Sequence, residues 1–234
     1  MGKTKHQEEQ ILQAEKKRIY RLYQYERELY EKGVELVAGV DEAGRGPLAG
    51  PVIAAAVILP RDCFIFGLND SKKIGEAKRY ALEKEIKEKA LAWAVGAAGA
   101  HDIDRINIYQ ATLLAMSRAI RKLALKPDHL LIDAVKLKQV DIPQTPVIKG
   151  DAKSASIAAA SILAKCHRDR LMTLYDKRFP EYGFIRHKGY PTPVHIGLDL
   201  KLGRTCIHRT SFHLKEREAG EELNVANETS PCHP

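Results

Sequence analysis

Residues 40–52 read Val40-Asp41-Glu42-Ala43-Gly44-Arg45-Gly46-Pro47-Leu48-Ala49-Gly50-Pro51-Val52, and this run decides the interpretation of the fold. It connects two apolar stretches. Residues 36–40 have the length of a short buried strand, and residues 52–59 form a continuous, partly β-branched run that is typical of a central strand buried on both faces. Two carboxylates and a glycine-rich turn lie between them. We therefore expect two strands, with polar side chains where the first strand ends.

Strand-like and helix-like segments alternate through the rest of the chain. Residues 6–33 place apolar side chains at helical spacing up to Gly33, which predicts one or two amphipathic helices. Further helices are expected at residues 69–89, from Asp102 or Asp104 to before Pro127, at 154–179 and at 191–203, and further strands at 92–98, 129–134 and 147–149. Strands followed by helices interleaved with strands indicate an α/β layered domain with a mixed sheet.

The positive charge of the chain is concentrated in its middle. Of the formal net charge of +8, residues 36–213 carry 28 Lys and Arg against 18 Asp and Glu, whereas both ends are close to neutral or acidic. A basic body suits a polyanionic partner such as nucleic acid, because neutralised phosphates release counterions. A basic but otherwise ordinary globular protein would show the same charge.

The cysteines and the ends of the chain argue against a secreted, zinc-bound or membrane protein. The four cysteines are scattered and form no C-x-x-C pair, so neither a zinc site nor a disulfide framework is indicated; they are Cys63, Cys166, Cys206 and Cys232. No apolar run reaches the roughly 20 residues of a membrane span, and the start is charged. We expect a cytoplasmic protein that does not associate with membranes.

Carboxylates follow or close three separate apolar strands. Asp41 and Glu42 close the first, Asp133 closes residues 130–133, and Asp151 follows residues 147–149. Acids at strand ends converge at one edge of a sheet, where their mutual repulsion is unfavourable unless a cation is bound. Oxygen ligands without His or Cys favour Mg²⁺ or Mn²⁺ over Zn²⁺. Taken singly, each acid could instead cap a turn, and consecutive strand residues face opposite ways, so Asp41 and Glu42 share a site only where the strand ends or twists.

The glycine-rich tripeptide Gly44-Arg45-Gly46 follows the acid pair directly. Glycines let backbone amides and carbonyls approach a ligand closely, and Arg45 can reach a phosphate. The same tripeptide is often only a tight turn, so alone it is weak evidence.

Taken together, these motifs resemble the ribonuclease HII family, the type 2 ribonucleases H. Residues 40–52 resemble the opening signature of that family. Later blocks match in the same order, at residues 69–73, 132–134, 149–154, 158–165 and 187–192, so that the resemblance extends from about residue 36 to 212. It implies a ribonuclease H-like α/β fold, with a mixed central sheet flanked by helices. The domains expected are an N-terminal helical extension at 1–35, the catalytic domain at 36–213 and a flexible acidic tail at 214–234, with helices at the C-terminal end of the catalytic domain.

The resemblance also implies roles for particular residues. Gly44-Arg45-Gly46 matches the loop whose main chain reads the ribose 2′-hydroxyl, and Tyr190 matches the tyrosine that stacks on the sugar beside the cut. Lys72 is expected to contact a duplex phosphate, although a solvated lysine at a helix start fits the pattern nearly as well. The catalytic and metal-binding carboxylates are expected to be Asp41, Glu42, Asp133 and Asp151. His187, His195 and His213 lack paired spacing on a helix and are expected to be surface or hydrogen-bonded side chains rather than metal ligands.

The function implied is that of a metal-dependent endoribonuclease producing 5′-phosphomonoesters. It would cut the RNA strand of RNA/DNA hybrids and incise 5′ to ribonucleotides in duplex DNA, using two Mg²⁺ or Mn²⁺ ions and leaving 3′-hydroxyl and 5′-phosphate ends. Ribonucleotide excision repair and DNA replication are the processes that this activity serves. We expect a monomer whose partner is the hybrid or ribonucleotide-containing duplex.

Three alternatives remain at this point. Ribonuclease HIII shares the acids and fold but typically has a different tripeptide and a β-rich amino-terminal domain, whereas residues 1–35 look helical and short. A catalytically silent nucleic-acid-binding module is disfavoured by the presence of all four acids. A transposase or integrase on the same scaffold is disfavoured because no separate DNA-binding domain is visible in the sequence.

Overall fold

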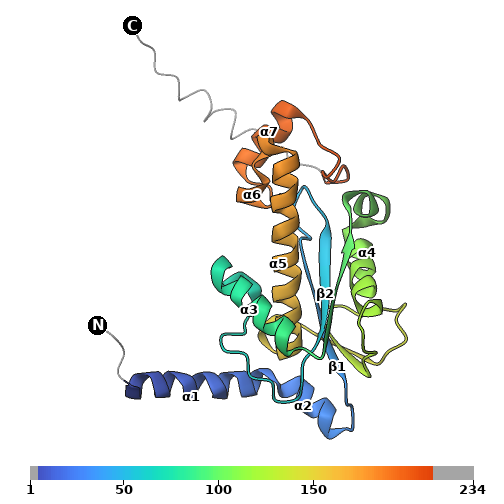
Figure 1. The fold of residues 1–234 in the computed structure, drawn as a ribbon. Coiled ribbons are helices and arrows are strands. Elements are labelled where there is room, and N and C mark those ends of the chain that lie inside the picture. Colours follow the sequence, from blue (N-terminus) through green and yellow to red (C-terminus); the bar gives the residue numbers. More distant parts are fainter. Residues whose placement is uncertain (1–4, 213–234) are drawn as a thin grey trace.

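A five-stranded sheet lies at the centre of the computed structural model, which describes residues 5–212 (Figure 1). Its strand order is β3-β2-β1-β4-β5. The strands are β1 (Val37–Ala43), β2 (Val52–Ile58), β3 (Ala92–Ala98), β4 (His129–Asp133) and β5 (Gln144–Val147). The β1–β2 and β2–β3 pairs are antiparallel, and the β1–β4 and β4–β5 pairs are parallel. The mixed sheet of an α/β fold that the sequence predicts is confirmed.

Helices cover both faces of the sheet. The long α5 (Ala155–Arg178) and the shorter α3 (Glu76–Lys89) pack on one face, and α4 (Ala100–Arg121) packs on the other (Figure 1). The Ala-rich start of α5 approaches β1 closely. A Cβ atom added at Gly39 of β1 would lie 2.0 Å from the backbone carbon of Ser156, so only glycine permits this approach.

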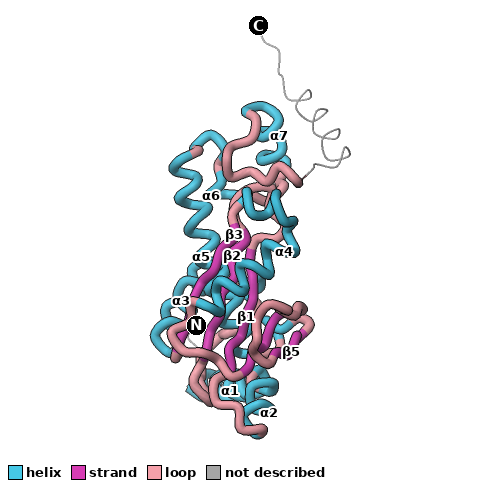
Figure 2. Tube along the Cα trace, turned by 90° about the vertical axis from the view of Figure 1, so that its right-hand side faces the viewer, coloured by secondary structure: helices cyan, strands magenta, loops and turns pink. Residues whose placement is uncertain are grey.

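Shorter elements extend the molecule at both ends (Figures 1 and 2). At one end, α1 (Lys5–Leu22) and α2 (Gln24–Glu31) lie across the beginning of α5. At the other end, its final turns pack against a group of short helices. These are the 3₁₀ turn η3 (Pro180–Tyr182), α6 (Phe184–His187) and α7 (Pro193–Leu202). Two further 3₁₀ turns, η1 (Ser71–Lys73) and η2 (Gly150–Ala152), lie in the loops that lead to α3 and α5.

The N-terminal helices are part of the packed body. Ile19, Leu22 and Tyr23 are buried against the same core cluster as the start of α5. Glu26 is fully buried, and its Oε1 accepts hydrogen bonds from Ser154 Oγ at 2.6 Å and from Ser156 N at 2.9 Å. Glu26 thereby satisfies donors at the N-terminus of α5, where a helix leaves backbone N–H groups without partners.

Some element boundaries differ from those expected. The first strand continues through Asp41 and Glu42 to Ala43, because both residues still pair with β2. The last strand is Gln144–Val147 rather than residues 147–149. It contains Pro146, which weakens the strand pattern but is tolerated on an edge strand. The starts of two predicted helices differ as well.

Neither Asp102 nor Asp104 caps α4, which begins after Gly99. Asp104 instead accepts hydrogen bonds from the backbone and hydroxyl groups of Thr210 and Ser211, and so ties α4 to the C-terminal segment. The helix expected from residue 69 is divided into η1 and α3, with the Asp70 side chain accepting from Lys72 N at 2.9 Å.

The predictions about membrane spans and cysteines can be compared with the structure within residues 5–212. None of the helices within residues 5–212 has both the length and the apolar composition that crossing a membrane would require. Cys63, Cys166 and Cys206 are free thiols. Cys232, His213 and the expected tail at residues 214–234 lie outside the part of the chain that the structure describes.

Candidate active site

The end of the β1–β4 pairing explains how two consecutive carboxylates approach one centre. The last parallel pair joins Val40 to Ile132, so Asp41 and Glu42 lie beyond it while they remain paired with β2. Their cross-strand partners Ala55 and Ala54 belong to the cores on opposite faces of the sheet. The two side chains therefore face opposite ways, as strand geometry requires. Because β1 and β4 are neighbouring strands, Asp133 at the end of β4 lies beside this part of β1.

Asp41 is the most deeply buried of the four acids, with 4% of its surface exposed. Its Oδ1 accepts from the backbone N–H of Glu42 at 2.7 Å, and the Ser161 hydroxyl on α5 also hydrogen-bonds to it. Ser161 in turn contacts the hydroxyl of Ser71 at 2.8 Å. Burial, followed by the charges of Glu42 and Asp133, raises the pKa of Asp41 well above its usual value.

A backbone hydrogen bond joins Asp133 to the turn that carries Asp151. The N–H of Gly150 in η2 donates to Asp133 Oδ1 at 2.7 Å. Ala134 and Lys149, which flank this contact, both have positive φ values of 54° and 55°. Such backbone is costly for residues other than glycine and persists only where the surroundings enforce it. The two loops are therefore held in sharp turns that bring Asp133 and Asp151 together.

Burial and neighbouring carboxylates also raise the pKa values of Glu42 and Asp151. Burial raises the pKa of Glu42, and Asp133 adds to the effect while Arg45 opposes it. Burial, then the charges of Asp70 and Asp133, raises the pKa of Asp151, and Lys72 opposes this. Asp70 also lies within hydrogen-bonding distance of Asp151. The four predicted carboxylates are thus electrostatic neighbours, with Asp70 beside them.

This donor set fits a hard divalent cation. Its ligands would all be oxygens, which suits Mg²⁺ or Mn²⁺, and a cation would relieve the repulsion that raises the pKa values of Asp41, Glu42 and Asp151. Within residues 5–212, no three His, Cys, Asp or Glu side chains lie close enough together to hold a metal ion as they stand. Binding of a cation by this set would therefore require the carboxylates to move closer together.

Two buried arginines donate hydrogen bonds to backbone carbonyls in and around the Gly44-Arg45-Gly46 loop. Arg209 donates to the carbonyl oxygens of Gly44 at 2.6 Å, Arg45 at 2.8 Å and Gly50 at 2.8 Å. Arg168 donates to three further carbonyls in the 49–51 and 188 segments. Gly44 has a φ of 98°, and a Cβ atom there would lie 2.1 Å from Arg168 Nε, so the position requires glycine. The backbone of the loop is therefore fixed before any ligand binds.

Tyr190 stands at the edge of the same loop. It is 40% exposed, and its ring edge would lie 3.8 Å from a Cβ atom at Gly46. The guanidinium of Arg168 lies 5.7 Å from the ring centroid. The backbone oxygen of Tyr190 contacts His195 Nδ1 at 2.9 Å. The structure thus brings the predicted tyrosine next to the predicted loop, with an exposed ring.

His187 and His195 belong to a packed aromatic cluster. Their rings stack with centroids 4.3 Å apart, and His195 contacts His208 at 3.1 Å between Nε2 atoms. Burial lowers the pKa of His195 to about 4. Both are hydrogen-bonded side chains, as the sequence predicts, and they support the segment that carries Tyr190.

Lys72 is exposed on η1 and lies near enough to lower the pKa values of Glu42 and Asp151. Sequence reasoning missed four residues of the site: Asp70, Ser161, Arg168 and Arg209. Asp70 lies in the matching block at residues 69–73, where no role in the site was predicted for it, and Ser161 is a polar position on an otherwise apolar stretch of α5. The arginines have no local signal, since their partners lie 117 and 159 positions away in the chain.

Comparisons with known proteins identify the family of the chain. The family model for ribonuclease HII matches residues 38–215. A curated ribonuclease HII from Syntrophomonas wolfei is 53% identical over 204 residues, covering 87% of this chain and 80% of that protein. Another, from Moorella thermoacetica, is 54% identical over 199 residues, covering 85% of this chain and 97% of that protein.

Solved structures show the same fold. The ribonuclease H2 of Pyrococcus horikoshii is similar with a TM-score of 0.64 and 24% identity, over 83% of this chain and all of that one (100%). The Bst ribonuclease HIII in complex with Mn²⁺ is similar with a TM-score of 0.58 and 18% identity, over 82% of this chain and 70% of that one. The ribonuclease H-like fold is confirmed, and the sequence match distinguishes between the two types: the chain belongs to the ribonuclease HII family.

Proposed function

We propose that the protein cuts the RNA strand of RNA/DNA hybrids and incises on the 5′ side of ribonucleotides embedded in duplex DNA, leaving 3′-hydroxyl and 5′-phosphate ends. Hydrolysis of hybrids follows from membership of the ribonuclease HII family at more than 50% identity. The observation that carries the mechanism is the group of mutually repelling carboxylates beside a backbone loop held by arginines.

The four acids would hold Mg²⁺ or Mn²⁺ at the end of β1 and β4. Bound divalent ions supply an activated water and stabilise the leaving 3′-oxygen of an in-line displacement. Asp41 and Asp133 have oxygens already fixed by Glu42 N and Gly150 N. Glu42 and Asp151, which like Asp133 are half-buried, would complete the ligand set, and Glu42 would do so beside its ion-pair partner Arg45. Preorganised ligands of this kind reduce the rearrangement that binding requires.

The protein residues around the acids would bind and orient the nucleic acid. Arg45 and Lys72, both exposed, supply positive charge for phosphates on either side of the cut. Free backbone polar groups of Gly44-Arg45-Gly46 would pair with the ribose 2′-hydroxyl, and the exposed face of Tyr190 would stack on the adjacent sugar. The 2′-hydroxyl is the group that distinguishes RNA from DNA at a given position.

Discrimination against DNA follows from the fixed loop. A site built to pair with a hydroxyl leaves its own polar groups unsatisfied when that hydroxyl is missing, which can cost a factor of about 10⁴ in rate. Arg209 restrains the loop because it donates hydrogen bonds to the carbonyl oxygens of Gly44 and Arg45, and Arg168 packs against Gly44 while it binds the neighbouring Ala49 carbonyl.

Three duplexes of the same sequence would test this proposal, containing one ribonucleotide, one 2′-O-methyl nucleotide or only DNA. Each would be incubated with Mg²⁺ and wild type, Tyr190→Ala or the matched control Tyr190→Phe. We expect one incision 5′ to the ribonucleotide in the first duplex, none in the other two, a severe loss with Tyr190→Ala and near-normal cutting with Tyr190→Phe.

Comparable cutting of the all-DNA duplex would refute the ribonuclease assignment and favour an integrase-like nuclease. Unchanged cutting by Tyr190→Ala would refute only the stacking role. Omission of Mg²⁺, followed by addition of Mg²⁺ or Mn²⁺, tests the metal requirement in the same assay. Action as a monomer in the cytoplasm stays a prediction, which sedimentation and cell fractionation would check.

A further inference from the structure

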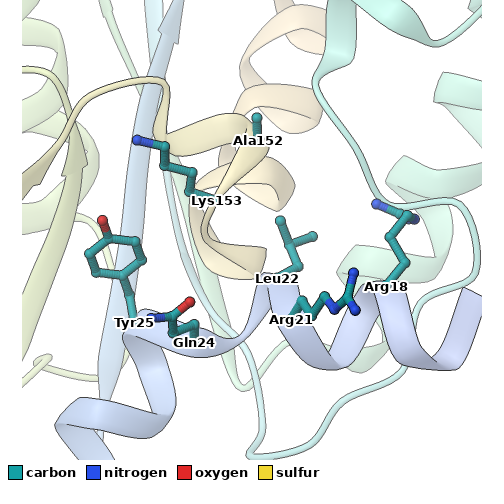
Figure 3. Close-up of a pocket in the computed structure, with 7 residues that line it drawn as sticks. All are labelled: Arg18, Arg21, Leu22, Gln24, Tyr25, Ala152 and Lys153. Atoms are coloured by element: carbon teal, nitrogen blue, oxygen red, sulfur yellow. The ribbon is translucent and has the colours of Figure 1, made fainter.

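A cationic cavity lies where the N-terminal helices meet the turn that carries Asp151 (Figure 3). It has a volume of about 390 Å³ and opens to solvent. Its walls come from the end of α1, the start of α2 and the residues just after Asp151. The lining residues are Arg18, Arg21, Leu22, Gln24, Tyr25, Ala152 and Lys153. Three of them are cations and none is an acid.

The cavity is built by the docking of the extension. The chain bends at Tyr23 between α1 and α2, and the buried side chains of Leu22 and Tyr23 fix this bend against the core. One turn later, Glu26 is hydrogen-bonded to Ser154 and Ser156 at the start of α5. In Figure 3, Arg18 and Arg21 project from α1 at one end of the cavity, while Lys153 and Tyr25 lie at the other.

Two of the three cations are uncompensated. Arg18 pairs with Glu15 at 2.7 Å and donates to the Leu68 carbonyl at 2.6 Å, so its role is partly structural. The exposed side chains of Arg21 and Lys153 make no hydrogen bond or ion pair with any residue in the 5–212 range. Tyr25 adds a hydroxyl that can donate to an anion, and the amide nitrogen of Gln24, which donates to Glu28 Oε1 at 3.0 Å, has a second N–H.

The cavity adjoins the catalytic acids on the side away from the glycine loop. Lys153 follows Asp151 by two residues, and the same turn donates to Asp133 through Gly150 N. Arg45, in contrast, pairs with Glu42 at 3.4 Å, and the segment that carries Tyr190 lies toward the opposite end of the molecule from α1 (Figure 1). The acids thus lie between the loop and the cavity.

We propose that this cavity binds a backbone phosphate diester of the substrate duplex, outside the scissile position and on the side of η2. The proposal rests on the proposed nuclease function, since it gives the duplex a second anchor beyond the cut. Guanidinium and ammonium groups are the usual phosphate ligands, and contacts of this kind position a duplex without reading its sequence. The N-terminal helices therefore form part of the substrate-binding surface.

Binding of a duplex with one ribonucleotide would be measured in chelator by fluorescence anisotropy for Arg21→Ala, Lys153→Ala and the double variant. Lys17→Ala removes the same charge from an exposed position of α1 outside the cavity and is the matched control. We expect each cavity variant to weaken binding about fivefold, and the double variant to reduce the slope of log Kd against log salt by about 1 to 2. An equal loss with Lys17→Ala would overturn the proposal, because it would reflect net charge alone.

A phosphate scan tests the same contact without relying on variants. Single phosphates of the duplex would be replaced by neutral methylphosphonates, one position at a time. Wild type should show weakened binding at one or two positions beyond the scissile phosphate, and the double variant should be insensitive there. No such position in wild type would overturn the proposal. Cleavage of the unmodified duplex by wild type, run in parallel, shows separately whether the proposed function itself holds.

A free anion is the other source of the same chemistry. Inorganic phosphate would be added to wild type and to the double variant, and the melting temperature followed. A rise of the melting temperature in wild type alone, together with unchanged duplex binding by the double variant, would show that the cavity takes a free phosphate and would overturn its assignment to the duplex.

Discussion

At the scale of single residues, the acids of the site differ in what holds them. Asp41 and Asp133 are each fixed by a backbone N–H, whereas Asp151 faces Asp70 and is restrained mainly by its turn. Because its pKa is raised by burial and by its acidic neighbours, Asp151 carries a free-energy cost when it is ionised without a metal.

Asp151→Asn should therefore separate catalysis from stability. We expect cleavage to fall by about a thousandfold or more, because a metal ligand is lost. In chelator at neutral pH, the melting temperature should rise above that of wild type, since one repelling charge is removed. Asp141→Asn, at an exposed acid remote from the site, is the control and should change neither quantity. Near-normal turnover by Asp151→Asn would remove this acid from the catalytic group.

The buried Arg209 forms no ion pair with a carboxylate within residues 5–212; it donates to backbone carbonyls and lies 5.0 Å from the centroid of the Phe212 ring. Burial lowers its pKa to about 9, and its contacts with Gly44, Arg45 and Gly50 repay this cost. A lysine cannot span these carbonyls, because its donors lie on one nitrogen. Arg209→Lys should therefore reduce the ratio of ribonucleotide to all-DNA cleavage by about tenfold or more, as the loop loosens.

The exposed Arg186→Lys serves as the control for the same chemical change. The ratio of rates is the informative measurement, because a general loss of stability would lower both rates together. A constant ratio in Arg209→Lys would show that the arginine supports folding only.

The site residues that the sequence predicts are those with a local pattern. Asp41, Glu42, Asp133 and Asp151 stand at strand ends, and Tyr190 lies in a recognisable block. The positioning roles of Ser161, Arg168 and Arg209 depend on contacts between distant segments. No periodicity or spacing encodes such contacts, so they became visible only in the fold.

At the scale of elements, the sequence predicted regular segments well and edges less well. The strongly apolar β2 and the Ala-rich α5 were placed within one or two residues. β5 was displaced because Thr145 and Pro146 do not resemble a strand, and it is held only along one edge by β4. β1 ran further than expected because its pairing with β2, rather than its composition, sets its end.

The docking of α2 on α5 has a pH dependence with a definite sign. Burial raises the pKa of Glu26, and its hydrogen bonds with Ser154 and Ser156 only partly oppose this. A group whose pKa is higher in the folded state contributes stability that is fully present below its unfolded pKa and is lost as pH rises through the folded pKa. Wild type should therefore lose stability as pH rises above the usual glutamate range.

Glu26→Gln should remove this loss. Between about pH 5 and about pH 8, the melting temperature of the variant should gain on wild type by a few degrees, on the order of 2–4 °C for each kcal/mol. Glu28→Gln, an exposed position of the same helix, should follow wild type. A constant difference between Glu26→Gln and wild type across this range would show that Glu26 does not titrate as a buried acid.

At the scale of the whole molecule, the extension and the catalytic body share one core. Ile19, Leu22 and Tyr23 are buried together with Ala155 and Ala158 of α5, so the sequence boundary near residue 35 is not a boundary in packing. We nevertheless propose that the chemical step does not need the extension, because none of the four acids lies in it.

Deletion of residues 1–34 tests both halves of this statement. Three buried side chains and the Glu26 contact would be lost, and at about 1.5–3 kcal/mol for each buried apolar side chain the melting temperature should fall by more than about 5 °C. Cleavage of the single-ribonucleotide duplex should still occur at saturating enzyme, below the new melting temperature, because the carboxylates and the glycine loop stay in place. An unchanged melting temperature would show that the helices are not docked in solution. Complete loss of cleavage in a folded truncated protein would instead mean that the cap on α5 and the turn beside it help to build the metal site.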